Sequence, residues 1–352
     1  MLPLTRPPKR ICIFRLSALG DVTHTVPVIH AIRRHWPSVE ITWIIGKLEH
    51  KLLSGLDNIE FVVFDKRGGW QAVKSLKSRL GNQQFDVLLH MQVALRANLL
   101  SRLVHSPIRL GWNRERSRDL HHGFVNHQVR HVPFQHQVEG FLEFAWALGI
   151  PPGPPEWSLP VSEADRQWAA EQLPGNQPTL LISPCSSHPL RNWRWERYAR
   201  AADYAVEHHG ARVALMGGPS DSERAAGESI QSAMQHRPIN LIGKDTLTQS
   251  MALLERGKVL LSPDSGPVHI ASAIGTPVIG LYAATWAKRS GPWNSLELSV
   301  DRFPEAARTF RGKEPDELRW GTRIEVDGVM ELISVEDVCK QIDQVLGVRK
   351  PR

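Results

Sequence analysis

The fold is indicated by residues 260–283, which read Leu-Leu-Ser-Pro-Asp-Ser-Gly-Pro-Val-His-Ile-Ala-Ser-Ala-Ile-Gly-Thr-Pro-Val-Ile-Gly-Leu-Tyr-Ala. An apolar run at 259–262 predicts a buried parallel strand. A turn follows, and a helix is expected from Pro267 to Ile274, where Gly275 ends it. Residues 277–281 then predict a second strand. Such a turn can bind phosphate at a helix N-terminus, but the same stretch could equally be a structural βαβ unit that binds nothing.

The same alternation of strands and helices extends along both halves of the chain. Strands are expected at 10–16, 39–45, 61–64, 85–90 and 108–110 in the first half, and at 179–183, 211–216 and 240–242 in the second. Helices are expected between them, including 22–35, 70–80, 138–148, 196–209 and 220–235. This alternation predicts an α/β protein with two parallel, doubly wound sheets.

The best candidate for a linker is the proline-rich run at 150–155. Four prolines in five residues favour a semi-rigid spacer. The expected domains are therefore 1–150 and 156–333. The last segment, 334–352, contains an amphipathic helix at 335–346 that we expect to pack back on the first domain. Residues 282–332 have too weak a pattern for an assignment.

Charge is distributed unevenly along the 352 residues, whose formal net charge is +7. Residues 1–150 contain 20 Lys and Arg against 11 Asp and Glu, so this half alone carries +9. A basic half attracts nucleic acid, anionic lipid head groups or phosphorylated sugars. Because the sequence has no nucleic-acid-binding motif, the anionic glycolipid is favoured over nucleic acid, although a merely solvated basic surface explains the charge as well.

The three cysteines, Cys12, Cys185 and Cys339, lie far apart and form neither a disulfide framework nor a zinc motif. No apolar run approaches the length of a membrane span. We therefore expect a cytoplasmic protein.

A turn of small residues, Ser17-Ala18-Leu19-Gly20-Asp21, follows the first strand. Gly20 permits close backbone approach by a ligand. Asp21 is either a helix N-cap or a general base. Because this turn is not the Gly-x-Gly-x-x-Gly fingerprint of dinucleotide-binding proteins, an NAD site is disfavoured.

Two further turns follow strands of the second half. Residues 183–193 contain Ser186, Ser187 and Arg191, and hydroxyl and guanidinium groups suit a pyrophosphate. Gly217-Gly218-Pro219 precedes Glu223, which could hold ribose hydroxyls. For either turn taken alone, a solvated loop that binds no ligand is the alternative interpretation.

Together these motifs resemble a known enzyme family. Phe14-Arg15-Leu16-Ser17-Ala18-Leu19-Gly20-Asp21 with His24, Thr25 and Pro27, Ser186-Ser187-His188 through Trp193, Gly217-Gly218-Pro219, and Asp264-Ser265-Gly266-Pro267-Val268-His269 resemble the heptosyltransferases of lipopolysaccharide core assembly, glycosyltransferase family 9. The resemblance covers nearly the whole chain. It implies a GT-B fold, with two Rossmann-like domains whose parallel sheets face each other across a cleft.

The resemblance also implies the reaction. A heptose would move, with inversion and without a metal or cofactor, from ADP-L-glycero-D-manno-heptose bound to the second domain. The acceptor would be the anionic lipid A–Kdo glycolipid or a heptosylated core, bound to the first domain, so the cytoplasmic enzyme would meet the surface of the inner membrane peripherally.

Site residues carry over from the family by position. Asp21 matches the catalytic base. The donor site would comprise Ser186, Ser187, Arg191, Glu223, Asp264, Ser265, Gly266, Pro267 and His269, and the acceptor site Ser17, Gly20, Arg67, Arg118 and His136. Arg191 stands where the family commonly has a lysine, and Asp221 is a rival to Glu223.

Two other functions are compatible with these residues. A nucleotide-sugar epimerase of similar architecture would turn over without an acceptor. A catalytically silent relative would bind glycolipid only, although the presence of Asp21 counts against it.

Overall fold

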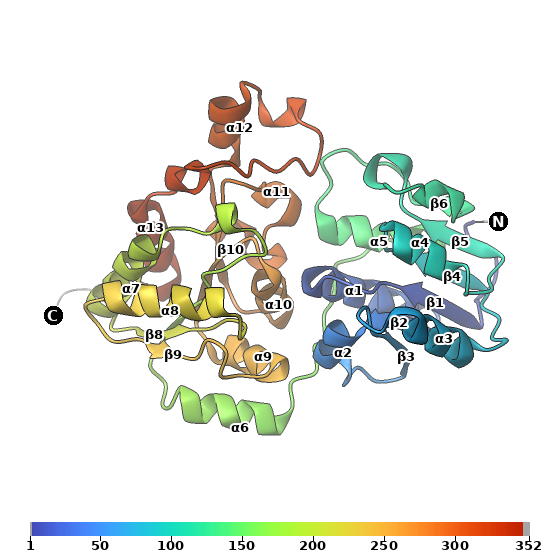
Figure 1. Ribbon diagram of the computed structural model, residues 1–352, viewed down its shortest axis with the longest axis horizontal. Helices are drawn as coiled ribbons and strands as arrows, with labels where there is room; N and C mark the ends of the chain where they lie inside the picture. The colour runs from blue at the N-terminus through green and yellow to red at the C-terminus, as the bar shows by residue number, and fades with distance from the viewer. Residues whose placement is uncertain (1, 348–352) are drawn as a thin grey trace. The chain divides into compact units, whose positions relative to one another are not determined.

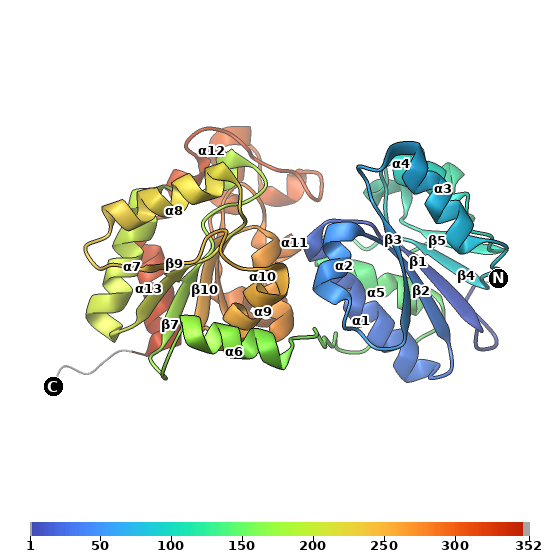
Figure 2. The same ribbon diagram turned by 60° about the horizontal axis from the view of Figure 1, so that its bottom comes forward.

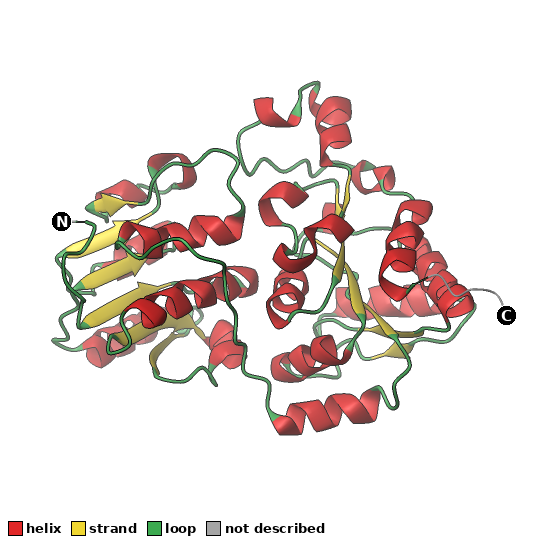
Figure 3. Ribbon diagram, turned by 180° about the vertical axis from the view of Figure 1, so that it is seen from behind, coloured by secondary structure: helices red, strands yellow, loops and turns green. Residues whose placement is uncertain are grey.

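The computed structural model describes residues 2–347, and the chain divides into two compact units, Met1–Pro160 and Val161–Arg352. Each unit contains one six-stranded sheet in which all neighbouring strands are parallel. Helices cover both faces of each sheet (Figures 1 and 3). The predicted α/β class with two doubly wound sheets is confirmed.

The first sheet has the strand order β3-β2-β1-β4-β5-β6. Its strands are β1 (Arg10–Phe14), β2 (Glu40–Gly46), β3 (Ile59–Phe64), β4 (Val87–His90), β5 (Ile108–Gly111) and β6 (His127–Gln128). Its helices are α1 (Leu19–His35), α2 (Lys47–Leu53), α3 (Gly69–Leu80), α4 (Leu95–Ser101) and α5 (Gln137–Ala147), with short 3₁₀ turns η1 (Arg114–Arg116) and η2 (His121–Gly123). The short strand β6 lies in a stretch for which the sequence predicted only a loop.

The two faces of the first sheet are covered by different helices. One core contains Leu76 and Leu80 from α3 together with Ala97 and Leu100 from α4, so these two helices share a face (Figure 2). Helices α1 and α5 pack on each other. Because both faces are covered, the strands are almost continuously apolar, as the sequence indicated.

The second sheet has the order β12-β11-β10-β7-β8-β9. Its strands are β7 (Thr179–Ile182), β8 (Arg212–Leu215), β9 (Ile239–Asn240), β10 (Val259–Pro263), β11 (Val278–Tyr282) and β12 (Val300–Asp301). Its helices are α6 (Glu163–Gln172), α7 (Trp195–His209), α8 (Asp221–Ala233), α9 (Leu247–Arg256), α10 (Gly266–Ile274), α11 (Ala287–Ser290), α12 (Phe303–Arg311) and α13 (Val335–Leu346), with 3₁₀ turns η3 (Pro189–Arg191), η4 (Trp293–Leu298), η5 (Pro315–Glu317) and η6 (Val329–Leu332).

The stretch at 260–283 forms the predicted strand, helix and strand. Helix α10 begins at Gly266, one residue before the expected Pro267, and ends at Ile274, where Gly275 follows with a φ of +95° that suits glycine. Strand β10 includes Pro263, and β11 begins at Val278. The central part of the second unit therefore follows the sequence pattern closely.

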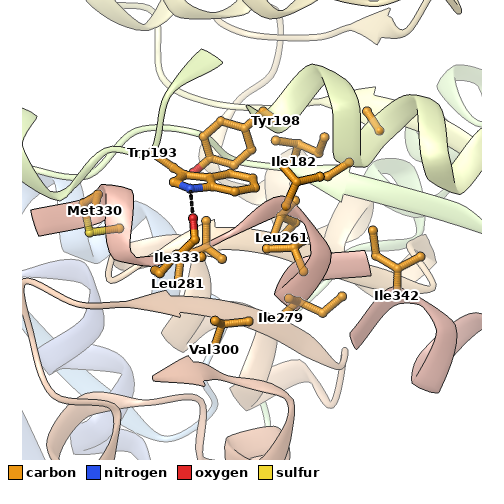
Figure 4. Close-up of a cluster of buried hydrophobic side chains, with 14 of the residues drawn as sticks. Ile182, Trp193, Tyr198, Leu261, Ile279, Leu281, Val300, Met330, Ile333 and Ile342 are labelled. Atoms are coloured by element: carbon orange, nitrogen blue, oxygen red, sulfur yellow. Dashed lines mark hydrogen bonds between the residues drawn. The ribbon is translucent and has the colours of Figure 1, made fainter. Parts of the chain in front are cut away.

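A large apolar core fills the second unit (Figure 4). Trp193 is fully buried there, and its indole Nε1 donates a hydrogen bond to the carbonyl oxygen of Ile333, 3.0 Å away. Val338 and Ile342 of α13 belong to the same core, and α13 packs on α7. This corrects the expectation that residues 334–352 return to the first domain: the apolar face of the helix is already buried in the second unit. Residues 348–352 of that segment lie outside the described residues.

The proline-rich run expected to be the linker belongs to the first unit, which extends to Pro160. Trp157 anchors this segment, since its Nε1 donates to the carbonyl oxygen of Thr23 at 3.1 Å, and Glu156 forms an ion pair with Arg34. The boundary between the two units therefore lies beyond the proline-rich run at 150–155.

Within residues 2–347, no helix has the length and apolar character needed to cross a bilayer.

Candidate active site

The topology of each sheet identifies the edge where a ligand is expected. The strand order reverses between β1 and β4 in the first sheet and between β7 and β10 in the second. In open parallel sheets, ligands bind beyond the carboxyl ends of the strands at such switch points. Asp21 follows β1, Ser186 follows β7, and Asp264 follows β10. Three of the predicted motifs thus occupy the two switch points.

Asp21 lies in the first turn of α1, as its third residue and not at the N-cap. The N-cap is Ala18, which has no side-chain acceptor, and Asp21 Oδ2 accepts a hydrogen bond from the Ala18 amide at 3.1 Å. The carboxylate therefore satisfies a backbone donor at the helix start, which is part of the structural role that the sequence left open.

Two polar side chains from distant segments orient the same carboxylate. Gln137 Nε2, at the start of α5, donates to Asp21 Oδ1 at 2.7 Å, and Arg15 forms an ion pair with Oδ2. The Asp21 side chain is 22% exposed and that of Arg15 only 10%. An oriented carboxylate that solvent still reaches meets two requirements of a general base, and the catalytic role of Asp21 stays a prediction. Sequence reasoning assigned no role to Gln137 or Arg15, although Arg15 lies within the quoted motif.

Three of the predicted acceptor residues lie around Asp21. Ser17 donates its amide to Gln92 Oε1 at 3.3 Å, and Gly20 is buried in the first turn of α1. His136 caps α5, where its Nδ1 accepts a hydrogen bond from the Val138 amide at 3.2 Å. Because Gln137 of the same helix start contacts Asp21, the structure brings His136 close to the candidate base.

Arg67 and Arg118 are exposed and lie on two other loops, which follow β3 and β5. The Arg67 amide donates to Asp65 Oδ1 at 2.9 Å. Arg118 lies 4.0 Å from the carboxylate of its neighbour Asp119. Both loops follow the carboxyl ends of strands in the first sheet, so they belong to the edge that carries Asp21.

In the second unit, the turn before α10 is built from Asp264, Ser265 and Gly266. Ser265 is the N-cap, but its hydroxyl bonds to that of Ser262 at 2.9 Å and does not cap the helix. The helix start therefore keeps amide donors available for an anion. Asp264 Oδ1 lies 3.8 Å from His269 Nε2, and both side chains are largely buried. Pro267, in the first turn, supplies no amide donor.

Arg191 is placed differently from the expectation. The guanidinium is buried, and its Nε donates to Glu325 Oε1 at 2.7 Å. Burial alone would raise the pKa of Glu325, but the hydrogen bond and the charge of Arg191 outweigh burial and lower that pKa. A pyrophosphate would therefore have to compete with Glu325 for Arg191, and its role in donor binding stays a prediction.

The two other donor turns are held by their own hydrogen bonds. Ser186 donates its amide to Asn192 Oδ1 at 2.7 Å and its hydroxyl to the His188 carbonyl oxygen at 2.9 Å, whereas Ser187 is exposed. Glu223 accepts hydrogen bonds from the Gly218 amide and from the Ser220 hydroxyl. Its carboxylate stabilises the turn that follows β8, while its rival Asp221 is exposed at the start of α8.

Across residues 2–347, no group of three or more His, Cys, Asp or Glu side chains is arranged to hold a metal ion.

Comparison with known proteins assigns the family. Residues 73–315 match the family described as Glycosyltransferase family 9 (heptosyltransferase). The lipopolysaccharide core heptosyltransferase OpsX of Haemophilus influenzae is 40% identical over 345 residues, which cover 98% of this chain and 99% of that protein.

Two solved structures have the same fold. The glycosyl transferase family 9 protein from Veillonella parvula superposes with a TM-score of 0.80 at 23% identity, covering 96% of this chain and 97% of that one. The ADP-heptose lps heptosyltransferase II of E. coli superposes with a TM-score of 0.72 at 20% identity, covering 96% and 98%. With these matches over nearly its full length, the chain belongs to glycosyltransferase family 9, the heptosyltransferases, and has their GT-B fold.

Proposed function

We propose that this protein transfers a heptose from ADP-L-glycero-D-manno-heptose to the inner core of lipopolysaccharide, with inversion at the anomeric carbon. The observation that carries the proposal is the 40% identity, over almost the whole of both chains, to a lipopolysaccharide core heptosyltransferase. That match favours a transferase over the epimerase and over a silent glycolipid-binding relative.

In the proposed mechanism, Asp21 takes the proton from the attacking hydroxyl of the acceptor. Gln137 and Arg15 hold its carboxylate in one orientation, which is what a base needs in order to act on a positioned hydroxyl. Because ADP is a good leaving group, no acid paired with Asp21 is required. This differs from the two-carboxylate arrangement of glycosidases.

In the second unit, the uncapped start of α10 would stabilise the diphosphate that leaves, through its amide groups and helix dipole. His269 would add hydrogen bonds to the donor. Glu223 is our candidate for the ribose hydroxyls, since its carboxylate stands at the carboxyl edge of β8. Arg191 would reach the diphosphate only by exchanging Glu325 for the phosphate oxygens.

The acceptor would bind to the first unit as an anionic glycolipid of the lipid A–Kdo type. Its carboxylates and phosphates match the exposed cations Arg67 and Arg118 in charge. We further propose that the enzyme works at the cytoplasmic surface of the inner membrane, where such a glycolipid would be presented to a peripheral protein.

A donor panel assayed against defined, truncated core acceptors tests the proposed function. We expect product mass to increase by one heptose with the ADP-heptose donor, and no conversion of that donor when the acceptor is left out, apart from slow hydrolysis. Conversion of the sugar nucleotide into an isomer without acceptor would instead indicate an epimerase. Binding of the glycolipid without any transfer would indicate a silent relative.

A further inference from the structure

Several exposed apolar side chains of the first unit lie on neighbouring segments of the chain. Among residues 2–347, the exposed large hydrophobic residues are Leu48, Trp70, Leu95, Leu99, Leu120 and Leu296. Four of them lie on three segments at or beside the carboxyl edge of the first sheet: the start of α3, helix α4, and the loop at 117–120. Trp70 is 82% exposed and Leu120 is 68% exposed. Single exposed apolar residues are ordinary, but a cluster of this kind indicates an interaction surface.

Hydrogen bonds show that the three segments are neighbours. Arg96 of α4 donates to the carbonyl oxygen of Lys66, in the turn before α3, at 2.9 Å. The amide of Leu95 donates to Asp119 Oδ2 at 3.2 Å, and Asn98 Nδ2 donates to the Asp119 carbonyl oxygen at 2.9 Å. Helix α4 therefore joins the other two segments, and α3 and α4 are seen on one face of the sheet in Figure 2.

Helix α4 carries apolar side chains on two faces, and only one of these faces is buried in the core of the first unit. Ala97 and Leu100 are buried in the core beneath the helix. Leu95 and Leu99 are four residues apart, so they share the opposite, exposed face, and Arg102 continues that face three residues later. Leu95 and Leu99 thus contribute apolar surface that the folded unit itself does not bury.

The same three segments also carry exposed cations. We define the apolar–basic surface as Trp70, Leu95, Leu99 and Leu120 with Lys66, Arg67, Arg96, Arg102 and Arg118. Two of these cations have carboxylate partners, since Lys66 pairs with Glu49 at 3.2 Å and Arg118 lies 4.0 Å from Asp119. Among residues 2–347, Arg67, Arg96 and Arg102 have no salt bridge to a carboxylate, so the three segments keep a positive excess. Arginine and lysine interspersed with tryptophan and leucine match an anionic bilayer, where indole and aliphatic groups enter the headgroup layer and cations contact lipid phosphates.

We propose that the apolar–basic surface docks the first unit on an anionic lipid bilayer. The inference rests on the proposed function for the choice of occupant, because a glycolipid acceptor is embedded in such a bilayer. Arg67 and Arg118, our candidates for acceptor binding, lie within the surface, so docking would bring the acceptor headgroup to the loops that bind it. The interface would thereby supply part of the acceptor specificity.

Sedimentation of the full-length protein with lipid vesicles tests the proposal. Vesicles of phosphatidylglycerol and phosphatidylcholine, without acceptor glycolipid, should bind the wild type, whereas vesicles of phosphatidylcholine alone should bind it weakly. High salt should weaken the binding because it screens exposed charges. The double change Trp70→Ser with Leu99→Ser should reduce partitioning by about tenfold or more, since both side chains would lose their burial in the interface.

The matched control is Leu296→Ser, which removes an exposed leucine from the second unit and should leave vesicle binding unchanged. Three results would overturn the proposal. The first is equal binding of the wild type to anionic and neutral vesicles, and the second is binding of the double variant to anionic vesicles as strong as that of the wild type. In the third result, the double substitution leaves vesicle binding unchanged but abolishes self-association of the protein, which would make the surface an interface between copies of this chain. Turnover of a delipidated, water-soluble acceptor separates docking from function. With this soluble acceptor, the double variant should keep the kcat/KM of the wild type. If the proposed function is wrong, the wild type and every variant should fail to transfer heptose, while vesicle binding by the wild type stays intact.

Discussion

Protonation of His121 is expected to loosen the loop that carries Arg118. His121 is fully buried, and its Nε2 accepts a hydrogen bond from the Trp112 amide at 3.2 Å. Nδ1 must then carry the proton, which it donates to Asn98 Oδ1 at 2.9 Å. A second proton on Nε2 would face a backbone donor. Burial, followed by the charge of His122, lowers the pKa of His121 to about 4.

The sign and size of the effect follow from this pKa. The ordinary value for histidine is 6.5, so between pH 6.5 and pH 4 the unfolded chain binds more protons than the folded one. The stability that neutral His121 contributes is complete above pH 6.5 and is lost as the pH falls through 6.5 toward 4. Linkage gives a loss of about 2 kcal/mol between pH 7 and pH 5. The pKa of buried His90 is also lowered, mainly by burial, and acts in the same direction.

Urea unfolding at pH 7 and pH 5 measures this loss. The wild type should lose about 2 kcal/mol more of its unfolding free energy over this interval than His121→Gln, because the variant lacks the titrating group. His105→Gln, which removes an exposed histidine of the same unit, should behave like the wild type. Equal losses in the wild type and in His121→Gln would refute the reasoning.

Three further predictions concern the acceptor, the metal requirement and the core. The double variant Arg67→Ala with Arg118→Ala should raise the acceptor KM, by about 2- to 30-fold at low salt and less at physiological salt, because two exposed ion pairs contribute about 0.2 to 1 kcal/mol each; steady-state kinetics that show a rise in the donor KM alone would contradict it. Activity should persist in EDTA, and a loss that Mg²⁺ or Mn²⁺ restores in the same assay would argue against the mechanism. Trp193→Phe removes the hydrogen bond to Ile333 and leaves a cavity, so urea unfolding should show a stability loss of about 1 to 3 kcal/mol, and an unchanged unfolding free energy would contradict this account of the core.

The central elements of both sheets could be predicted because their sequences carry strong local signals. The stretch at 260–283 has an apolar strand, a proline in the first helical turn and a glycine at the helix end, and each signal acts over a few residues. Strands β6 and β12 are only two residues long and lie in stretches to which the sequence assigned a loop or no structure, so the sequence did not reveal them. Helix α13 shows that an amphipathic face predicts burial but not the partner that buries it.

In the candidate site too, residues within a local motif could be predicted, but contacts between distant segments could not. Asp21, Asp264 and His269 lie in local motifs, and the structure places them at the switch points of the sheets. The partner of Arg191 could not be predicted, since Glu325 lies 134 residues away in a stretch without a recognisable pattern. Gln137 contacts Asp21 across a sequence separation of 116 residues, and a pairing over that distance leaves no local signal.

The catalytic role of Asp21 is tested most directly by the rate of heptose transfer in Asp21→Asn. The variant keeps the size of the side chain and one oxygen, but the amide cannot take a proton from the acceptor hydroxyl. Asp57→Asn, which changes an exposed aspartate of the same unit, serves as the matched control. With ADP-heptose and a defined core acceptor, we predict that kcat of Asp21→Asn falls by about 10²- to 10⁴-fold while the donor KM stays nearly unchanged and the control retains wild-type activity. A kcat close to that of the wild type in Asp21→Asn would contradict the assignment of the base.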